Sequence, residues 1–114
     1  LIYVYGSGRQ IRCFCHVNDA TDAIVKLIKS KFRNDIFNIG NNNYPISMID
    51  LAKYVSKQFK PKIKIVKIPF QKSDRTQKRE IYFRKPNLTK VKKAINYKPK
   101  INLKKIISEY FSTS

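Results

Sequence analysis

The segment that decides the fold is YGSGRQIRCFCHVND, residues 5–19. Gly6 and Gly8 favour a tight turn in which positive φ angles are allowed. Arg9 and Arg12 follow at a spacing that lets an extended chain present both cations to one anionic ligand. Arginine suits a phosphate because its planar fork makes paired hydrogen bonds and keeps its charge near pH 7. The same residues also fit a hairpin turn with solvated arginines.

Strand and helix signals alternate along the chain. Residues 1–5 are β-branched and aromatic and predict a strand that runs into the glycine turn. Further extended pieces are expected at residues 11–17, 36–39 and 63–68. Apolar residues at helical spacing predict four helices, which begin near Asn18, Ser47, Asn87 and Asn102. We therefore expect an α/β chain with about four helices and three to four short strands.

The predicted helix after Asn18 has one apolar stripe, opposite Lys26 and Lys29. The stripe consists of Ala20, Ala23, Ile24, Leu27 and Ile28. The helix after Ser47 is predicted to continue through Phe59 and to end near Pro61. Residues 36–39 are expected to belong to a parallel sheet whose other strands lie outside this sequence.

Residues 70–83 form the most polar and least regular segment. Two interpretations remain open for it. The first is a mobile surface loop, and the second is a lid over an anionic ligand, because polar loops of this length often carry function.

The chain has 114 residues and a net charge of +18, from 25 basic and 7 acidic residues. Such a charge is typical of nucleic-acid-binding proteins. However, lysines outnumber arginines 19 to 6 and are scattered through every predicted element. No stretch approaches the roughly 20 apolar residues that span a bilayer, and no signal peptide opens the chain. The first residue is not methionine, so we expect a fragment of a larger protein. The two cysteines, too close in sequence for a disulfide framework, indicate a cytoplasmic location.

Cysteine and histidine do not form an obvious metal or catalytic cluster. Cys13 and Cys15 are separated by one residue, which would strain a disulfide between them. Adding His16 gives three adjacent potential zinc ligands without a fourth at the usual spacing. We therefore predict no metal site, two buried free thiols and a structural role for His16.

Five short motifs resemble, in order, the C-terminal substrate-binding part of extended short-chain dehydrogenases/reductases, the NAD-dependent nucleotide-sugar epimerases, dehydratases and decarboxylases. The first motif is Tyr-Gly-x-Gly-x-Gln-x-Arg-x-Phe-x-x-Val-x-Asp at residues 5–19. The others are Phe37-Asn38-Ile39-Gly40, Ile46-Ser47-Met48-Ile49-Asp50-Leu51-Ala52, Arg84-Lys85-Pro86-Asn87-Leu88-Thr89-Lys90 and Ile95-Asn96-Tyr97-Lys98-Pro99. Departures from the family pattern are His16 for tyrosine, Asn87 for aspartate and Asn96 for glycine.

The resemblance implies a substrate-binding site but no catalytic residue. Arg12 and Arg84 match two family arginines that hold the diphosphate of the nucleotide-sugar from opposite sides. Val4 and Tyr5 match positions that wall the base pocket. The whole chain, residues 1–114, would be the C-terminal nucleotide-sugar-binding region of a Rossmann-type enzyme, with most of the parallel sheet missing. The parent enzyme would be a homodimer.

The cofactor and the catalytic pair are expected elsewhere. The three glycines of this chain, Gly6, Gly8 and Gly40, do not fit a dinucleotide fingerprint. No tyrosine has a lysine four positions later, so the family's Tyr-x-x-x-Lys pair is absent from this sequence. We therefore expect NAD(P) to bind in the full-length parent and not to this chain, which alone would be inactive.

Two other functions remain open at this stage. One is a basic nucleic-acid-binding module, which would require a continuous positive face with stacking aromatic residues. The other is a non-catalytic relic or scaffold that no longer binds nucleotide-sugar. The sequence does not decide between epimerase, dehydratase and decarboxylase chemistry.

Overall fold

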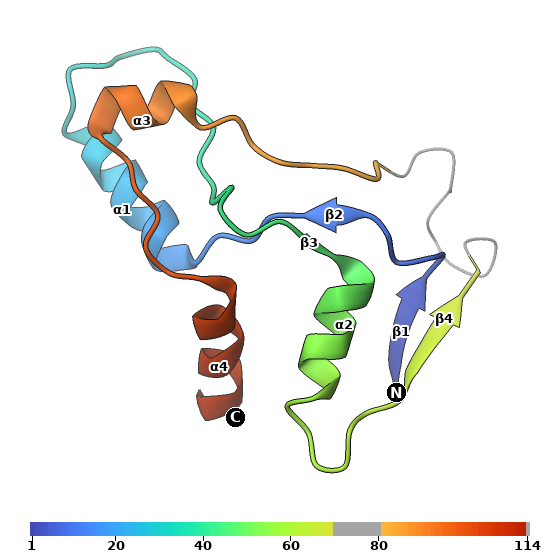
Figure 1. Cartoon of the computed structure of the whole chain (residues 1–114). Coiled ribbons are helices and arrows are strands. Elements are labelled where there is room, and N and C mark those ends of the chain that lie inside the picture. Colours follow the sequence, from blue (N-terminus) through green and yellow to red (C-terminus); the bar gives the residue numbers. More distant parts are fainter. Residues whose placement is uncertain (70–80, 114) are drawn as a thin grey trace. The chain divides into compact units, whose positions relative to one another are not determined.

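The computed structural model describes residues 1–69 and 81–113, so most of the polar segment at residues 70–83, with its two interpretations as a surface loop or a lid, lies outside the described residues. The chain forms two compact units. Unit 1 contains residues 1–12 and 45–84, and unit 2 contains residues 13–44 and 85–114. The described residues contain four helices and four short strands (Figure 1). This confirms the predicted α/β class.

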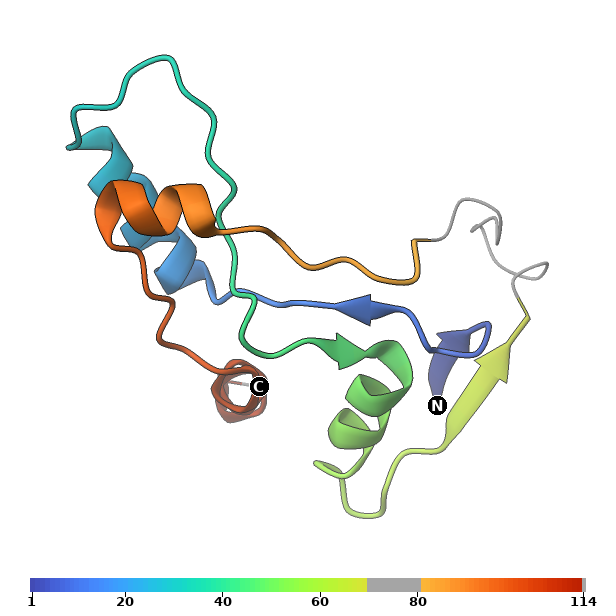
Figure 2. The ribbon, with the colours of Figure 1, turned by 45° about the horizontal axis from the view of Figure 1, so that its top comes forward.

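Unit 1 is built from two small sheets and one helix. β1 (Ile2–Tyr5) pairs in parallel with β4 (Ile65–Ile68), and α2 (Met48–Ser56) contacts both strands (Figure 1). β2 (Ile11–Arg12) pairs antiparallel with β3 (Ile46–Ser47), as Figure 2 shows from another direction. Of the extended piece predicted at residues 11–17, only β2 is a strand, because only these two residues find a paired neighbour.

The glycine turn packs directly against α2. Gly6 and Gly8 have φ angles of 67° and 73°, which confirms the predicted positive-φ turn. A Cβ atom on Gly8 would lie 2.7 Å from Val4 Cγ1 and 2.8 Å from Ile49 Cβ. The Ile49 N–H donates to the carbonyl oxygen of Gly8 at 2.9 Å. Glycine is therefore required at position 8 by both its φ angle and the space available.

The predicted cap at the start of α2 is confirmed, but the helix ends earlier than predicted. The Ser47 side chain caps the helix by accepting a hydrogen bond from the Asp50 N–H at 3.2 Å. The helix ends at Ser56, so Phe59 and Pro61 lie beyond it. The Ser56 hydroxyl donates to the carbonyl oxygen of Ile63, which ties the end of the helix to the chain leading into β4.

Unit 2 contains three helices, α1 (Val17–Ile28), α3 (Thr89–Ile95) and α4 (Leu103–Thr113). Its small core is formed by two of them, α1 and α3, with the adjoining loops. The core consists of Ala23, Leu88, Val91 and Tyr97, surrounded by Leu27, Phe37, Ile39 and Ile95. The predicted cap at Asn102 is confirmed, because its side-chain oxygen accepts from the Lys105 N–H at 2.9 Å.

The first helix of unit 2 differs from prediction in two respects. Its cap is His16 and not Asn18, because the His16 ring accepts a hydrogen bond from the Asn18 N–H. The predicted apolar stripe is also only partly buried. Ala23 and Leu27 face the core, whereas Ile24 and Ile28 are exposed.

The predicted strand at residues 36–39 is not formed. A β-strand is defined by pairing with a neighbour, and within the described residues this segment has none. Phe37 and Ile39 nevertheless pack against the core of unit 2, so the segment is held on one side. Within the part of the chain that the structure describes, no helix is both long enough and apolar enough to cross a membrane.

Candidate functional site

In unit 1, the chain around Ile11 lies between two neighbouring segments. On one side, Ile11 and Arg12 pair with Ser47 and Ile46 of β3. On the other side, Ile11 forms a parallel bridge with Phe83. The Ile11 N–H donates to the carbonyl oxygen of Tyr82 at 2.6 Å. Residues 82–84, which end the long polar segment, are thus fixed beside β2 by backbone hydrogen bonds.

This register brings the two predicted diphosphate ligands together. Arg12 and Arg84 each follow a bridge partner by one residue, in extended segments that run in the same direction. Because side chains alternate between the faces of a strand, we infer that both arginines leave the backbone on the same face. The Arg84 N–H donates to the carbonyl oxygen of Ile11 at 3.1 Å. Arg12 Nη1 donates to the same oxygen at 2.9 Å.

Two guanidinium groups on adjacent chains repel each other, because neither can lose its proton near neutral pH. An anion placed between them removes this repulsion and accepts several charge-assisted hydrogen bonds. Arg12 is half-buried and Arg84 is exposed. The arrangement therefore suits a phosphate or diphosphate that approaches from solvent.

The two residues predicted for the base pocket lie in the other sheet of unit 1. Val4 is 6% exposed and lies beneath Gly8 and Ile49, so its side chain belongs to the packing of the glycine turn. Tyr5 is 37% exposed and pairs with Ile68. As neighbours on one strand, Val4 and Tyr5 point to opposite faces. In the structure, only Tyr5 of these two has a surface that a ligand can reach.

His16 has the structural role that the sequence predicts. Its Nδ1 atom accepts a hydrogen bond from the Asn18 N–H at 2.9 Å, so the ring proton lies on Nε2. Nε2 then donates to Glu109 Oε2 at 2.7 Å. The pair borders a hollow of about 460 Å³, lined by Cys15, His16, Val17, Ile106, Glu109 and Tyr110. The hydrogen bonds to Asn18 and Glu109 hold the His16 ring between α1 and α4.

Cys13 and Cys15 are free thiols, but both are half-buried and not fully buried as predicted. Burial raises the pKa of Cys13, and the nearby positive charge of Lys85 partly offsets this rise. The Cys15 sulfur lies 3.7 Å from the Tyr97 hydroxyl, which donates to the carbonyl oxygen of Gly40 at 2.6 Å. Burial, followed by the contact with Cys15, raises the pKa of Tyr97.

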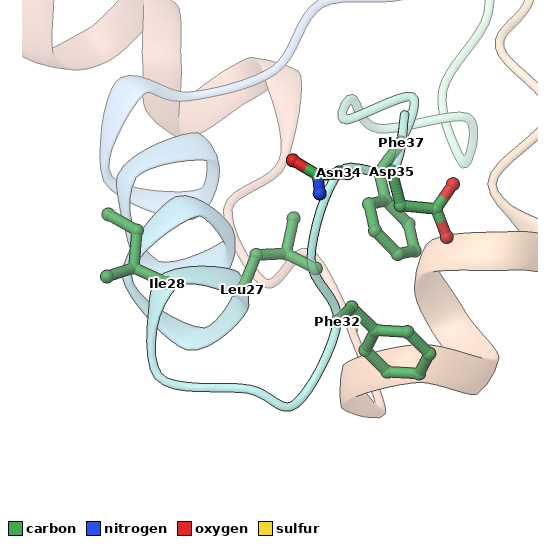
Figure 3. A pocket seen from close by; sticks show the side chains of 6 residues that line it. All are labelled: Leu27, Ile28, Phe32, Asn34, Asp35 and Phe37. Atoms are coloured by element: carbon green, nitrogen blue, oxygen red, sulfur yellow. The ribbon is translucent and has the colours of Figure 1, made fainter.

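A second hollow, of about 280 Å³, lies at the end of α1 in unit 2 (Figure 3). It is lined by Leu27, Ile28, Phe32, Asn34, Asp35 and Phe37. Its Phe32 and Phe37 rings meet edge to face, with their centroids 5.6 Å apart. Lys90 of α3 pairs with Asp35 and lies 4.8 Å from the centre of the Phe37 ring. This pairing lowers the pKa of Asp35.

Comparison with known proteins agrees with the resemblance found in the sequence. Residues 1–40 match the NAD dependent epimerase/dehydratase family. Over 108 residues, the chain is 32% identical to a UDP-N-acetyl-alpha-D-glucosaminuronate decarboxylase from Bacillus cytotoxicus. That match covers 95% of this chain and 33% of the relative. Over 97 residues it is 33% identical to UDP-glucuronic acid decarboxylase 5 of Arabidopsis thaliana, covering 85% of this chain and 26% of that relative.

Solved structures show the same fold. Pal from Bacillus thuringiensis matches with a TM-score of 0.81 and 27% identity, over 98% of this chain and 34% of that structure. The UDP-glucose 4-epimerase of Thermotoga maritima, solved with UDP-glucose, matches with a TM-score of 0.78 and 23% identity, over 98% of this chain and 35% of its own. The chain thus spans about a third of the length of these proteins. These matches do not favour the nucleic-acid-binding alternative.

Proposed function

Because this chain is related in sequence and in fold to the extended short-chain dehydrogenases/reductases of the NAD-dependent epimerase/dehydratase family, we propose that it is the nucleotide-sugar-binding part of such an enzyme. Residues 1–114 form this part, and a preceding Rossmann domain binds NAD(P) and supplies the catalytic tyrosine and lysine. The parent enzyme is a cytoplasmic homodimer in this proposal. Arg12 and Arg84 together hold the substrate diphosphate.

The observation that carries the proposal is the register that places Arg84 beside Arg12. These residues are more than seventy positions apart in sequence, and the bridge between Ile11 and Phe83 brings their two segments side by side. A diphosphate has oxygens enough to engage both guanidinium forks at once. Each such charge-assisted contact contributes about 1.5–3 kcal/mol to binding.

The relatives narrow the substrate class. The relatives reported above are named as decarboxylases of UDP-linked uronic acids. We therefore assign a UDP-linked sugar acid to this site as its most suitable substrate. The diphosphate is the part of the substrate that Arg12 and Arg84 contact.

In this proposal the preceding domain binds the dinucleotide cofactor, because the three glycines of this chain do not form a dinucleotide fingerprint. Gly6 and Gly8 share one turn, and a Cβ atom on Gly8 would overlap Val4 and Ile49, so one side of the turn is closely packed. Hence this turn leaves no approach for a pyrophosphate along its packed side. We derive no hydride-transfer step from the residues of this chain.

Binding of UDP to the purified 114-residue chain tests the proposal. Both arginines lie in one unit, so the chain carries the diphosphate contacts itself. Isothermal titration calorimetry should show UDP bound at least ~10-fold more tightly than uridine, because uridine lacks the diphosphate. R12A and R84A should each remove this preference.

The control variant is R33A. Arg33 lies in the other unit, and its side chain donates to the carbonyl oxygens of its own loop. It changes the net charge by the same amount as R12A without touching the β2 region. If UDP and uridine bind equally, or if R33A weakens UDP binding as much as R12A does, the diphosphate assignment is wrong.

A further inference from the structure

Six lysines of unit 1 lie close together in the sequence, within residues 53–67. All of them are exposed, namely Lys53, Lys57, Lys60, Lys62, Lys64 and Lys67. In the described part of unit 1, Asp50 is the one acidic residue. Among the described residues, none of the six lysines forms an ion pair with a carboxylate. This surface therefore carries positive charge that unit 1 itself does not neutralise.

The connection between α2 and β4 brings four of these lysines onto one short loop, residues 57–64, which we call the lysine loop. It carries Lys57, Lys60, Lys62 and Lys64. Figure 1 shows it as the turn that leads from the end of α2 to the start of β4. The Ser56 hydroxyl donates to the carbonyl oxygen of Ile63, so the two ends of the loop are joined at its base. The four ammonium groups are therefore held near one another.

The stability of the fold explains only some of these charges. Lys53 and Lys57 lie at the C-terminal end of α2, where a cation stabilises the helix. Lys67 lies in β4, and a lysine on an edge strand discourages unwanted pairing. Lys60 and Lys62 belong to neither element and flank Pro61 in the loop. Their charges repel each other without stabilising a helix or a strand, so an anionic partner accounts for them better.

The lysine loop lies at the end of unit 1 opposite the glycine turn. At one end of the parallel pair, the Ile2 N–H donates to the Lys64 carbonyl oxygen at 2.9 Å, and at the other end the Gly6 N–H donates to Ile68 at 2.7 Å. α2 begins beside the glycine turn and ends at the lysine loop, and its nine residues span about 13 Å. Arg12 pairs with Ile46, just before α2 begins. A partner on the loop therefore leaves the arginine site open.

The side chains of the loop indicate the chemistry of this partner. Lysine is a compact point charge without the planar fork of arginine, so it suits a diffuse array of anions better than one oriented phosphate. Phe59, in the same loop, is 38% exposed and supplies an apolar contact. Four or more lysines beside an exposed aromatic residue are typical of segments that bind anionic lipid headgroups. Single-stranded nucleic acid, in contrast, is bound by several stacking aromatic rings, and this loop has one.

We propose that the lysine loop docks on a membrane surface rich in anionic lipid. Its four lysines lie on the headgroups, and Phe59 enters the boundary between the headgroups and the acyl chains. The binding is peripheral and reversible, because it depends on charge and on one aromatic side chain. This inference goes beyond the proposed function and does not depend on it.

Co-sedimentation of the 114-residue chain with lipid vesicles tests the inference. One set of vesicles contains equal parts of phosphatidylcholine and phosphatidylserine, and the other contains phosphatidylcholine alone. At about 0.15 M salt the chain should sediment with the mixed vesicles and remain in solution with the neutral ones. The double variant K60Q/K62Q should bind the mixed vesicles at least ~10-fold more weakly, because two charges at the headgroups are lost.

The matched control is the double variant K92Q/K93Q. Lys92 and Lys93 are exposed on α3, in the other unit, so this variant loses the same net charge without changing the lysine loop. It should bind the mixed vesicles within ~2-fold of wild type, because attraction to the headgroups falls off within a Debye length. Circular dichroism melting should show that both double variants remain folded, as expected for exposed positions.

Three results would overturn the inference. The first is equal binding to both kinds of vesicle, and the second is an equal loss of binding in K60Q/K62Q and K92Q/K93Q, which would make net charge the cause. The third is release of the chain from the mixed vesicles by polyuridine RNA at the same concentration of anionic charge, which would assign the loop to nucleic acid. Vesicle binding is measured without nucleotide, so its failure and a failure of UDP binding are separate outcomes.

Discussion

Arg12 and Arg84 donate to one atom, the carbonyl oxygen of Ile11, the first through its side chain at 2.9 Å and the second through its backbone at 3.1 Å. The hydrogen bond from the Arg84 N–H to the Ile11 carbonyl oxygen holds the backbone of Arg84 next to that of Arg12. The Arg84 side chain does not take part in that hydrogen bond. Therefore R84A removes a cation from the site without removing the contact that holds residues 82–84 beside β2.

Kinetics of the complete enzyme should show that the two arginines act as one unit. We expect R12A or R84A to raise the KM for the nucleotide-sugar roughly 10- to 100-fold, because each removes a charge-assisted contact. The double variant should lose less than the product of the two single effects, because both residues engage the same diphosphate. Steady-state kinetics of the four proteins measure this coupling. Unchanged KM values for both single variants would exclude the clamp.

Replacing Gly8 should destabilise unit 1 strongly. An alanine there has a φ near 73° and a Cβ less than 3 Å from Val4 and Ile49. The left-handed backbone costs about 1–2 kcal/mol, and relief of the overlap costs a further ~1–3 kcal/mol. Urea unfolding of G8A should therefore show a loss of about 2–5 kcal/mol.

Gly40 provides the comparison for that prediction. A Cβ on Gly40 would meet only the Pro86 ring, at 3.2 Å, and its φ lies outside the left-handed range. G40A should cost about 1 kcal/mol or less, because a small shift of the ring relieves the contact. Equal losses of unfolding free energy for G8A and G40A would show that the glycine turn is not closely packed on α2.

The buried carboxylate of Asp19 should be a major source of stability in unit 2. It accepts hydrogen bonds from the backbone N–H groups of Lys100 and Ile101, at 3.1 and 2.9 Å. In D19N the side-chain amide has one oxygen that can accept a hydrogen bond. Its NH₂ group then faces the second backbone N–H, where neither group can accept. We expect a loss of about 1–3 kcal/mol in urea unfolding, together with faster exchange of the Ile101 amide. D22N, at an exposed position on the same helix, should change stability little.

Local chemistry predicted the parts of the fold that depend on a few adjacent residues. The caps at Ser47 and Asn102 and the turn at Gly6 and Gly8 were all found as the sequence indicates. The departure of Asn96 from the family glycine is also explained. Asn96 adopts a left-handed conformation with φ of 53° at the end of α3, and asparagine tolerates this better than most residues.

Features set by distant residues could not be predicted. Asn18 is the commoner type of helix cap, but His16 takes that role because Glu109, 93 positions away, orients its ring. The apolar spacing of α1 shows that Ile24 and Ile28 lie on a helix, but not what covers them. The resemblance to the family predicted that Arg12 and Arg84 bind the diphosphate. Only the bridge between Ile11 and Phe83 in the structure showed that the two residues lie on neighbouring segments.

Alkaline pH should reveal the contribution of Tyr97 to stability. Its hydroxyl donates to the carbonyl oxygen of Gly40, and burial raises its pKa above the ordinary value of 10.0. The unfolded chain therefore loses this proton first as the pH rises. It follows that the stabilisation is complete below pH 10 and is lost progressively above it. At pH 8, Y97F should cost about 1–3 kcal/mol, because the Gly40 carbonyl loses its donor.

Urea unfolding of wild-type and Y97F proteins at pH 8 and at pH 11 measures this effect. The difference in unfolding free energy between them should shrink at the higher pH, because only the wild-type protein has the phenol at position 97. The other tyrosines and the lysines titrate in both proteins, so their effects cancel in the comparison. A difference that stays constant would indicate that Tyr97 ionises equally easily in the folded and unfolded chain, against the contact geometry at Gly40.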